Sequence, residues 1–523
     1  MRRSPRPTSR LRRTPRSLSL LTVGVCLLAT ACGTQVDDTT RQRAAAAALS
    51  GGGTSVVADP ALADGVLGAV GQTGPAVPGG AVASTTAAGP ATPGGAGAPG
   101  TTGGPAAPGG SGAPGTAGGP AAPASAGSTG GTTGSVAAPA PPGGNGGATD
   151  VGVTATQILV GNVSDLSGPQ PGLFQSAVNG TNAYIAMVNS QGGLFGRKLK
   201  ISVADSQTSC EGDRSGHAGL VDDVFAFAGS FSLFDSCGAS VLKENPSVPD
   251  VHNAVTPEAN ALPNNFSVNP IGSTLNNGVY QWGTGKFGAD AVKKTAFLYV
   301  NLPAVTNVAR LQKKSAASAG WDVVYERAVG ATETDFTADI LQMKREGIQV
   351  FLTLFNSDQM ANFKPQADRQ DFRPQYLAPL MYDQSFFKKL GGPQAAEGIY
   401  GSLSTALYFG KADAAQIPAV AQFQKFYAQV AGGGAADTFA ASAWASTHLL
   451  VDAMRKAGPK VTRAAVLANL TATKSFDAGG FYAPGNPGDK KAGNCYVIFQ
   501  IRGGEYQRTD SPAKGFRCDG KQA

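Results

Sequence analysis

The chain has 523 residues, with 42 Lys and Arg against 35 Asp and Glu and a formal net charge of +7. Seven of the arginines lie within the first 16 residues, so the remaining 35 basic residues balance the acidic ones. This balance gives no indication of a basic nucleic-acid-binding surface on the rest of the chain, and no nucleic acid is expected as a partner. The histidines are too scattered in sequence to indicate a metal site, and no cofactor is predicted; they are His217, His252 and His448.

Residues 1–31 have the three parts of a secretory leader. The arginine-rich start is followed by an apolar stretch at 18–28 and then by the small residues Ala29, Thr30 and Ala31. The apolar stretch is well short of the roughly 20 residues that a membrane-spanning helix needs. The pattern therefore predicts a signal peptide, export of the chain and removal of the leader.

Cys32 follows the small residues directly and resembles the lipobox cysteine of bacterial lipoproteins. The resemblance implies that its thiol is acylated and that the leader is cut before it. The exported protein would then be lipid-anchored on the extracytoplasmic face of the cell membrane. Ala29 stands where that family most often has leucine. The alternative is an ordinary signal peptide followed by an incidental cysteine.

Residues 32–149 form a segment dominated by Ala, Gly, Pro, Ser and Thr. Between Asp64 and Asp150 there is no charged or aromatic residue, and 97–108 recurs almost unchanged at 112–123. Such a chain buries too little apolar surface to offset the entropy of ordering it. We expect a disordered tether with an end-to-end distance of about 60 Å.

From residue 151 the chain alternates short apolar runs with helical stretches. The alternation predicts an α/β fold with parallel sheets covered on both faces, and the length predicts two lobes. Ligands of such sheets bind outside the carboxyl ends of the strands. The expected strands are 157–163, 199–204, 224–228, 295–300, 323–327, 349–354, 376–380 and 496–501. The expected helices are 175–189, 213–223, 274–286, 305–319, 335–346, 359–370, 418–431, 440–457 and 463–471.

Enzyme motifs are missing from the sequence, which has no G-x-S-x-G, H-E-x-x-H, P-loop or C-x-x-C pattern. One formal match to G-x-G-x-x-G, at 283–288, follows an expected helix and precedes an expected strand. This order is the reverse of that in dinucleotide-binding folds. We therefore expect a helix-terminating loop there, and a protein that is not an enzyme.

Four cysteines remain after the leader and Cys32 are set aside, namely Cys210, Cys237, Cys495 and Cys518. An even number in an exported protein indicates disulfide bonds. Three pairings are open, and we favour Cys210 with Cys237 and Cys495 with Cys518 because each pair is close in sequence. Each bond would stabilise the fold by about 3 kcal/mol.

Several phrases of the globular part point to one family. Asp165-Leu-Ser-Gly-Pro169 follows the first expected strand, and the most specific phrase, NSQGGLFGRK at 189–198, leads into the second. The further phrases are AGS at 228–230, TDFT at 334–337 and GIQVF at 347–351. Over about 150–507 the chain resembles the leucine/isoleucine/valine-binding family of type I periplasmic binding proteins, the substrate-binding components of ABC importers.

The resemblance implies two doubly wound lobes joined by a three-crossing hinge. Lobe 1 would comprise 151–271 and 406–480, and lobe 2 would comprise 272–405 and 481–523. A disulfide between Cys210 and Cys237 would match one that the family often has in its first lobe.

The resemblance also implies how the ligand is held. In the family, hydroxyls and backbone amides of lobe 1 bind the ligand carboxylate, and an acidic residue of lobe 2 binds the ammonium group. The matching lobe 1 residues are Ser230 and Ser232, with Asn253 and Thr256 as second candidates. In lobe 2 the loop Tyr382-Asp383 matches the ammonium-binding position, with Asp383 as the carboxylate.

Apolar and amide residues complete the expected site. Phe174 and Phe439 would form its apolar wall, with plain core packing as the alternative for each. At two lobe 2 strand ends where the family often offers tyrosines, the chain has Asn301 and Asn356. Amides donate and accept hydrogen bonds where a tyrosine would also stack. This departure opens the site to amides, small peptides, other amino acids or polar aromatic acids.

The sequence therefore predicts a solute-binding lipoprotein outside the cytoplasm. It would capture a small polar ligand, such as an amino acid, an amide or a related small acid, and deliver it to an ABC permease. The membrane would be a partner through the lipid anchor. The alternative on the same fold is a ligand-sensing receptor component without transport.

Overall fold

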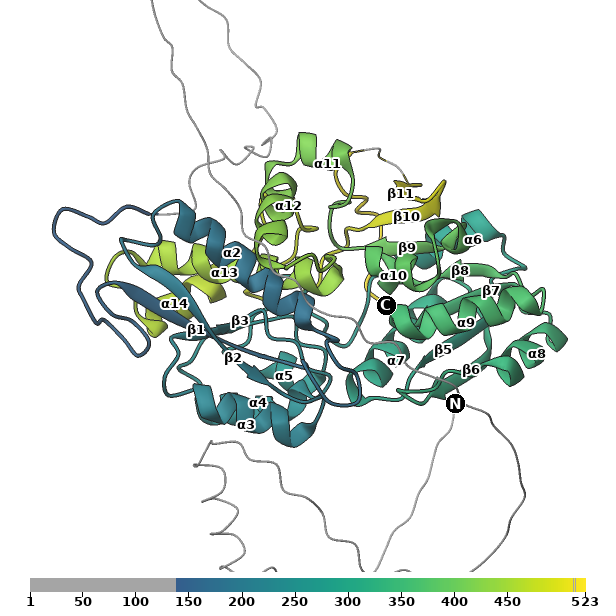
Figure 1. Ribbon diagram of the computed structural model, residues 1–523, viewed down its shortest axis with the longest axis horizontal. Helices are drawn as coiled ribbons and strands as arrows, with labels where there is room; N and C mark the ends of the chain where they lie inside the picture. The colour runs from purple at the N-terminus through teal and green to yellow at the C-terminus, as the bar shows by residue number, and fades with distance from the viewer. Residues whose placement is uncertain (1–137, 511, 513) are drawn as a thin grey trace, which may run out of the picture. The chain divides into compact units, whose positions relative to one another are not determined.

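The computed structural model describes residues 138–523 except 511 and 513 (Figure 1). The predicted leader, the predicted lipidation site at Cys32 and the tether up to residue 137 lie outside the described residues. Within the described part, no helix is both long and apolar enough to cross a membrane.

Lobe 1 is built on a parallel sheet with the strand order β2-β1-β3-β4. Ile158 and Val160 of the first strand belong to one hydrophobic cluster, whereas Leu159 and Val163 pack in another. This division follows from the strand geometry, in which successive side chains point to opposite faces. The sheet is therefore covered on both sides, as predicted. The strands are β1 (Gln157–Ser164), β2 (Lys198–Asp205), β3 (Ala226–Ala228) and β4 (Asp250–Val251).

Helices α2 and α13 lie on one side of this sheet, and α3 and α4 lie on the other (Figure 1). Asp437 begins α13, because its carboxylate accepts hydrogen bonds from the backbone N–H groups of Phe439 and Ala440. The long helix α13 packs along α2 and α14. The helices are α2 (Gln175–Ser190), α3 (Cys210–Leu220), α4 (Asp235–Glu244), α5 (Pro257–Ala261), α11 (Lys411–Gln416), α12 (Pro418–Val430), α13 (Thr438–Ala457) and α14 (Arg463–Ala472).

Lobe 2 is built on a sheet with the order β11-β10-β9-β8-β7-β5-β6. The expectation of parallel strands fails at one edge, where β10 runs antiparallel to β9 and β11. The hairpin turn Gly503-Gly504, in which both residues have a positive φ, accounts for the antiparallel pairing of β10 with β11. The strands are β5 (Thr295–Val300), β6 (Val323–Val329), β7 (Val350–Leu354), β8 (Gln375–Leu377), β9 (Tyr400–Leu403), β10 (Val497–Arg502) and β11 (Glu505–Arg508).

Both faces of the lobe 2 sheet are covered. Leu352 and Leu354 of β7 share a hydrophobic cluster with residues of α6 and α7, whereas Phe351 stacks on Phe363 of α9 at 4.3 Å between ring centres. The helical segments are α6 (Gly278–Phe287), α7 (Pro303–Ser318), α8 (Thr337–Arg345), α9 (Ser357–Arg369) and α10 (Gln384–Lys389), with the short 3₁₀ turns η1 (Pro379–Met381) and η2 (Pro393–Ala396).

The expected strand at 376–380 is shorter than predicted, since β8 ends at Leu377 and the turn η1 begins at Pro379. Proline has no backbone N–H and cannot continue a central strand. The short strands β4 and β9 were not predicted, because their two and four residues carry too little periodicity.

Asn269 joins the three chain crossings between the lobes. Its amide nitrogen donates to the hydroxyl of Ser404 at 3.1 Å, and its amide oxygen accepts from the backbone N–H of Gly493 at 3.4 Å. A hydrogen bond from the backbone N–H of Ala483 to the backbone carbonyl of Ser404 adds to this junction. One side chain therefore holds together segments that are far apart in sequence.

Both favoured disulfide bonds are present. Cys210 pairs with Cys237, which ties α3 to α4, and Cys495 pairs with Cys518, which fastens the C-terminal segment beside β10. Arg197, from the most specific family phrase, holds residues 138–149 against lobe 1. Its guanidinium donates to the backbone carbonyls of Asn145 and Gly147. The last part of the segment expected to be a tether therefore packs on the fold.

Candidate functional site

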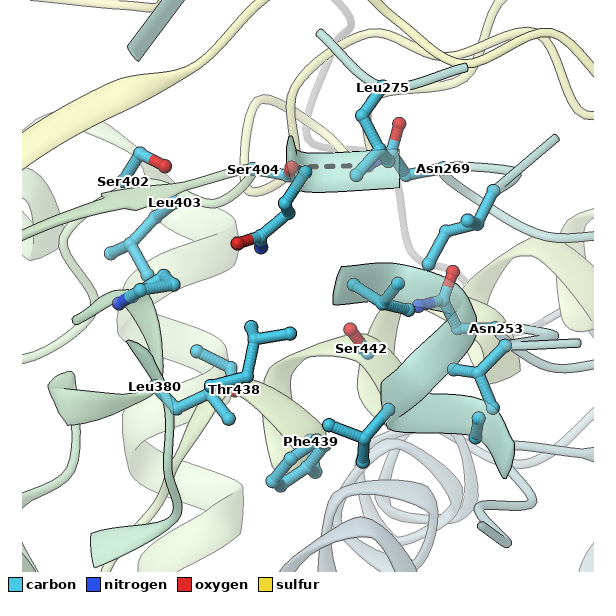
Figure 2. Close-up of a pocket in the computed structure, with 18 of the residues that line it drawn as sticks. Asn253, Asn269, Leu275, Leu380, Ser402, Leu403, Ser404, Thr438, Phe439 and Ser442 are labelled. Carbon is cyan, nitrogen blue, oxygen red and sulfur yellow. Dashed lines mark hydrogen bonds between the residues drawn. The ribbon is translucent and has the colours of Figure 1, made fainter. Parts of the chain in front are cut away.

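A cavity of about 370 Å³ lies between the two lobes (Figure 2). Lobe 1 contributes the loops that follow β1, β3 and β4 together with the start of α13. Lobe 2 contributes the ends of β5, β7 and β8, and the hinge segments close the cavity from the side. Most of these positions are at the carboxyl ends of parallel strands, where α/β sheets bind ligands.

Half of the predicted ligand-binding residues line this cavity, and they come from both lobes. In Figure 2, Asn253 and Ser442 lie on one side of the central space, and Leu380 and Leu403 lie across it. The predicted residues that line the cavity are Phe174, Ser232, Asn253, Asn356 and Phe439.

Phe174 and Phe439 form part of a phenylalanine cluster at the lobe 1 wall. Their ring centres are 4.7 Å apart in an edge-to-face arrangement, and Phe231 packs 5.3 Å from each of them. The three rings fix one another's orientation, so they present a rigid apolar surface to the cavity. Contact of these rings with a ligand stays a prediction.

Two lobe 1 candidates are engaged inside the lobe and do not line the cavity. The hydroxyl of Ser230 accepts a hydrogen bond from the backbone N–H of Val163 at 3.1 Å. The hydroxyl of Thr256 donates to the carboxylate of Asp235 at 2.5 Å. Asn301 of lobe 2 is exposed and also lies outside the cavity wall. Ser232 and Asn253 are therefore the lobe 1 polar candidates that the structure brings together.

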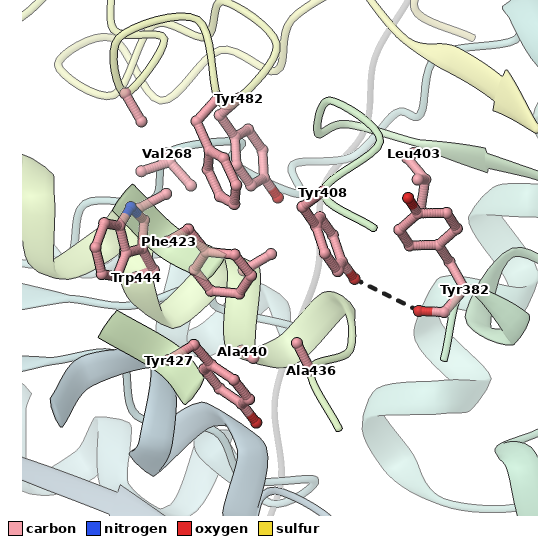
Figure 3. Packing of buried hydrophobic residues seen from close by; sticks show 14 of the residues in the cluster. Val268, Tyr382, Leu403, Tyr408, Phe423, Tyr427, Ala436, Ala440, Trp444 and Tyr482 are labelled. Atoms are coloured by element: carbon pink, nitrogen blue, oxygen red, sulfur yellow. Dashed lines mark hydrogen bonds between the residues drawn. The ribbon is translucent and has the colours of Figure 1, made fainter. Parts of the chain in front are cut away.

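Tyr382 packs into an aromatic cluster instead of lining the cavity (Figure 3). Its ring stacks on Phe409 at 4.8 Å, and its backbone carbonyl accepts a hydrogen bond from the hydroxyl of Tyr408 at 3.4 Å. Burial raises the pKa of Tyr382 well above its ordinary value. These packing contacts are sufficient to account for the position of Tyr382, so no contact with a ligand is needed to explain it.

Asp383 lines a second cavity of about 320 Å³, which shares Asn356 and Phe439 with the first. Its carboxylate begins α10 by accepting from the backbone N–H of Ser385 at 2.7 Å. Asp437 lines the same cavity. The predicted ammonium-binding carboxylate therefore lies beside the main cavity and not in its wall.

The wall of the main cavity is uncharged. None of the described residues that form it is an Asp, Glu, Lys, Arg or His. Three of its polar atoms are buried without a hydrogen-bond partner in the described structure, and these are Asn253 Oδ1, Gln312 Oε1 and Thr405 Oγ1. Buried polar groups are normally paired, so these three atoms mark polar parts of the wall whose hydrogen bonding is incomplete.

Sequence reasoning missed Asn269, Gln312 and Thr405 of this site. Gln312 had a detectable signal, because it interrupts an apolar helical face at the spacing of Val305 and Val308. The sequence around Asn269 and Thr405 carried no such signal, because their place in the cavity wall depends on segments that are distant in sequence.

Comparison with known proteins agrees with this geometry. Residues 157–505 match the sequence profile of the family described as periplasmic binding protein. The chain belongs to the periplasmic binding protein family. The predicted resemblance and the predicted fold are thereby confirmed.

Among curated relatives, the Leu/Ile/Val-binding protein homolog 7 of Brucella abortus is 24% identical to this periplasmic binding protein over 230 residues. The match covers 42% of this chain and 57% of the relative, less than two thirds of the relative's length.

Solved structures of binding proteins of ABC transporters share the fold. A fatty acid ABC transporter substrate-binding protein from Thermomonospora curvata matches with a TM-score of 0.59 at 19% identity, over 73% of this chain and 97% of that chain. The branched-chain amino acid transporter substrate-binding protein LivJ from Streptococcus pneumoniae, in complex with isoleucine, matches with a TM-score of 0.56 at 16% identity. This match covers 67% of this chain and 98% of that chain. A solute-binding protein from R. palustris, in complex with benzoate, matches with a TM-score of 0.55 at 18% identity. This match covers 69% of this chain and 98% of that chain.

Proposed function

We propose that this protein is the extracytoplasmic ligand-binding component of an ABC importer. It binds a small organic molecule between its lobes and delivers it to a permease. The observation that carries the proposal is the cavity to which both lobes and the hinge contribute. A ligand that contacts both lobes stabilises their closed arrangement, and a permease can recognise that arrangement.

The proposed location follows from the leader and from Cys32. Cleavage before Cys32 and acylation of its thiol would anchor the protein on the outer face of the membrane, with residues 33–137 as a spacer. The proposed role is binding without catalysis, as is typical of this family.

The uncharged wall favours an acid or an amide over an amino acid as the ligand. A carboxylate is held well by neutral N–H and O–H donors. A buried ammonium group needs a negative partner, and none of the described residues in the main cavity wall supplies one. Asp383 would have to bind the ammonium group from the second cavity, and its role as the ammonium-binding carboxylate stays a prediction. The named ligands of the structural relatives include a fatty acid and benzoate as well as isoleucine.

A thermal-shift screen of the chain without its leader tests this function. The screen uses amino acids, amides and small carboxylic acids. A ligand at 100 times its Kd should add about 2.7 kcal/mol to the free energy of unfolding. Asn253→Ala should weaken the binding of that ligand about tenfold, because a buried hydrogen bond is lost.

Asn362→Ala is the matched control, since Asn362 lines only the second cavity. The proposal is contradicted if the variant of Asn362 loses the ligand and the variant of Asn253 retains it. It is also contradicted if no compound of any class, including longer-chain acids and alcohols, shifts the unfolding temperature.

A further inference from the structure

We propose that the ligand is amphipathic, with a hydrogen-bonding head group between the lobes and an apolar body inside lobe 2. This inference rests on the proposed binding function and specifies the class of ligand. It comes from the shape and chemistry of the part of the cavity that enters lobe 2.

That part is an apolar channel between α7 and the lobe 2 sheet. Val305, Val308 and Gln312 follow one another along a single face of α7. Across the channel are Leu352 and Leu354, which point to the same side of β7 because side chains alternate along a strand. The channel therefore has mainly aliphatic walls contributed by a helix and a sheet, with Gln312 as the polar residue on the helix side.

The channel is elongated. Val305 and Gln312 both line it and are seven residues apart on α7, which corresponds to about 10 Å along the helix axis at 1.5 Å per residue. A branched-chain amino acid side chain is too short to occupy this length. A hydrocarbon chain or an extended ring system is of the right dimension.

The aliphatic side chains of the channel are incompletely covered by the protein. Val279 of α6 and Val305 and Val308 of α7 are half-buried, although all three pack against a hydrophobic cluster of lobe 2. Covering apolar surface of this kind is favourable by about 25 cal/mol per Å². An apolar ligand body would provide that cover.

The head-group end of the cavity is polar but uncharged. Thr405 is only 4% exposed and its hydroxyl is without a hydrogen-bond partner in the described structure, as is the amide oxygen of Asn253. The Thr405 hydroxyl can donate or accept, whereas the unpaired atom of Asn253 is an amide oxygen that accepts, so together they suit a head group that both donates and accepts, such as a hydroxyl or a protonated carboxyl. Since the described wall has no carboxylate, an alkylammonium ion has no oppositely charged partner there.

The test is a titration of the chain without its leader with hexanoate, octanoate, decanoate and dodecanoate below their micelle concentrations. The alcohols and amines of the same lengths are titrated in parallel. We expect the affinity for acids to rise about fourfold per added methylene until the channel is filled, and then to level off. Alcohols should bind, and amines should bind at least tenfold more weakly than the acids.

Val308→Trp should reduce the affinity for decanoate at least tenfold by filling the channel. Val324→Trp is the matched control, because Val324 is 53% exposed on β6 in the same lobe and does not line the cavity. Circular dichroism checks the fold of each variant. If Val308→Trp is misfolded, the smaller change Val279→Phe fills the channel from α6 instead.

An affinity that does not depend on chain length overturns the inference. So does wild-type affinity for decanoate in a folded Val308→Trp or Val279→Phe variant. If no chain compound binds but a small polar compound does, with loss on Asn253→Ala, the inference fails while the proposed function stands. If nothing binds, the proposed function itself fails.

Discussion

Asp437 shows how strongly a single half-buried residue can depend on pH. Burial raises its pKa from 3.8 to about 7, although hydrogen bonds from the backbone of Ala440 and from the hydroxyl of Ser176 act in the opposite direction. The negative charge of nearby Asp383 raises it further. A carboxyl with a raised pKa in the folded state stabilises the fold below its unfolded pKa and loses that contribution as pH rises.

Asp437→Asn should therefore gain stability relative to the wild type as pH rises from about 4 to about 7. Asparagine still accepts the N-terminal hydrogen bonds of α13, so the cap itself is kept. Urea unfolding of both proteins between pH 4.5 and 8 measures the difference in free energy. A difference that stays constant across this range would show that Asp437 is not perturbed by burial.

At the residue scale, side-chain direction limited the prediction of the site. Ser230 and Ser232 both belong to the loop after β3, but Ser230 turns inward to bond Val163 and only Ser232 reaches the cavity. Tyr382 and Asp383 are neighbours, yet one is packed among aromatic rings and the other caps a helix. These directions depend on contacts with distant segments, which a sequence pattern does not encode.

At the element scale, long periodic segments were predicted well. The expected helix 440–457 corresponds to α13 (Thr438–Ala457), and the expected strand 295–300 is identical to β5. The antiparallel edge formed by β10 and β11 was not predicted, because its turn consists of two glycines that indicate a break without its direction. Local periodicity therefore predicts the regular helices and strands, whereas the order and direction of strands in a sheet depend on tertiary packing.

The three hinge segments depend on one side chain, which gives a prediction at this scale. Asn269→Ala removes the bonds to Ser404 and Gly493 and should lower the free energy of unfolding by about 1 to 3 kcal/mol. It should also weaken ligand binding, since the segments it joins line the cavity. Urea unfolding and titration with the best ligand measure the two effects. Unchanged stability together with unchanged affinity would rule out a role for Asn269 as the hinge junction.

At the scale of the whole molecule, the sequence predicted two lobes and a ligand between them, and the structure has a cavity there. What the sequence left open was the chemistry of the ligand. Predicted polar residues pointed to a small polar molecule, whereas the walls combine aliphatic residues from α7, β7 and β8 that are scattered over the sequence. An apolar channel of this kind arises only when the lobe is folded.

A crystal structure of the protein with decanoate would show directly where the ligand binds. We predict electron density for the chain between Val308 and Leu352, with the head group within hydrogen-bond distance of Asn253 and Thr405. Density for the ligand in the second cavity beside Asp383, with the channel in lobe 2 filled by protein side chains, would contradict it.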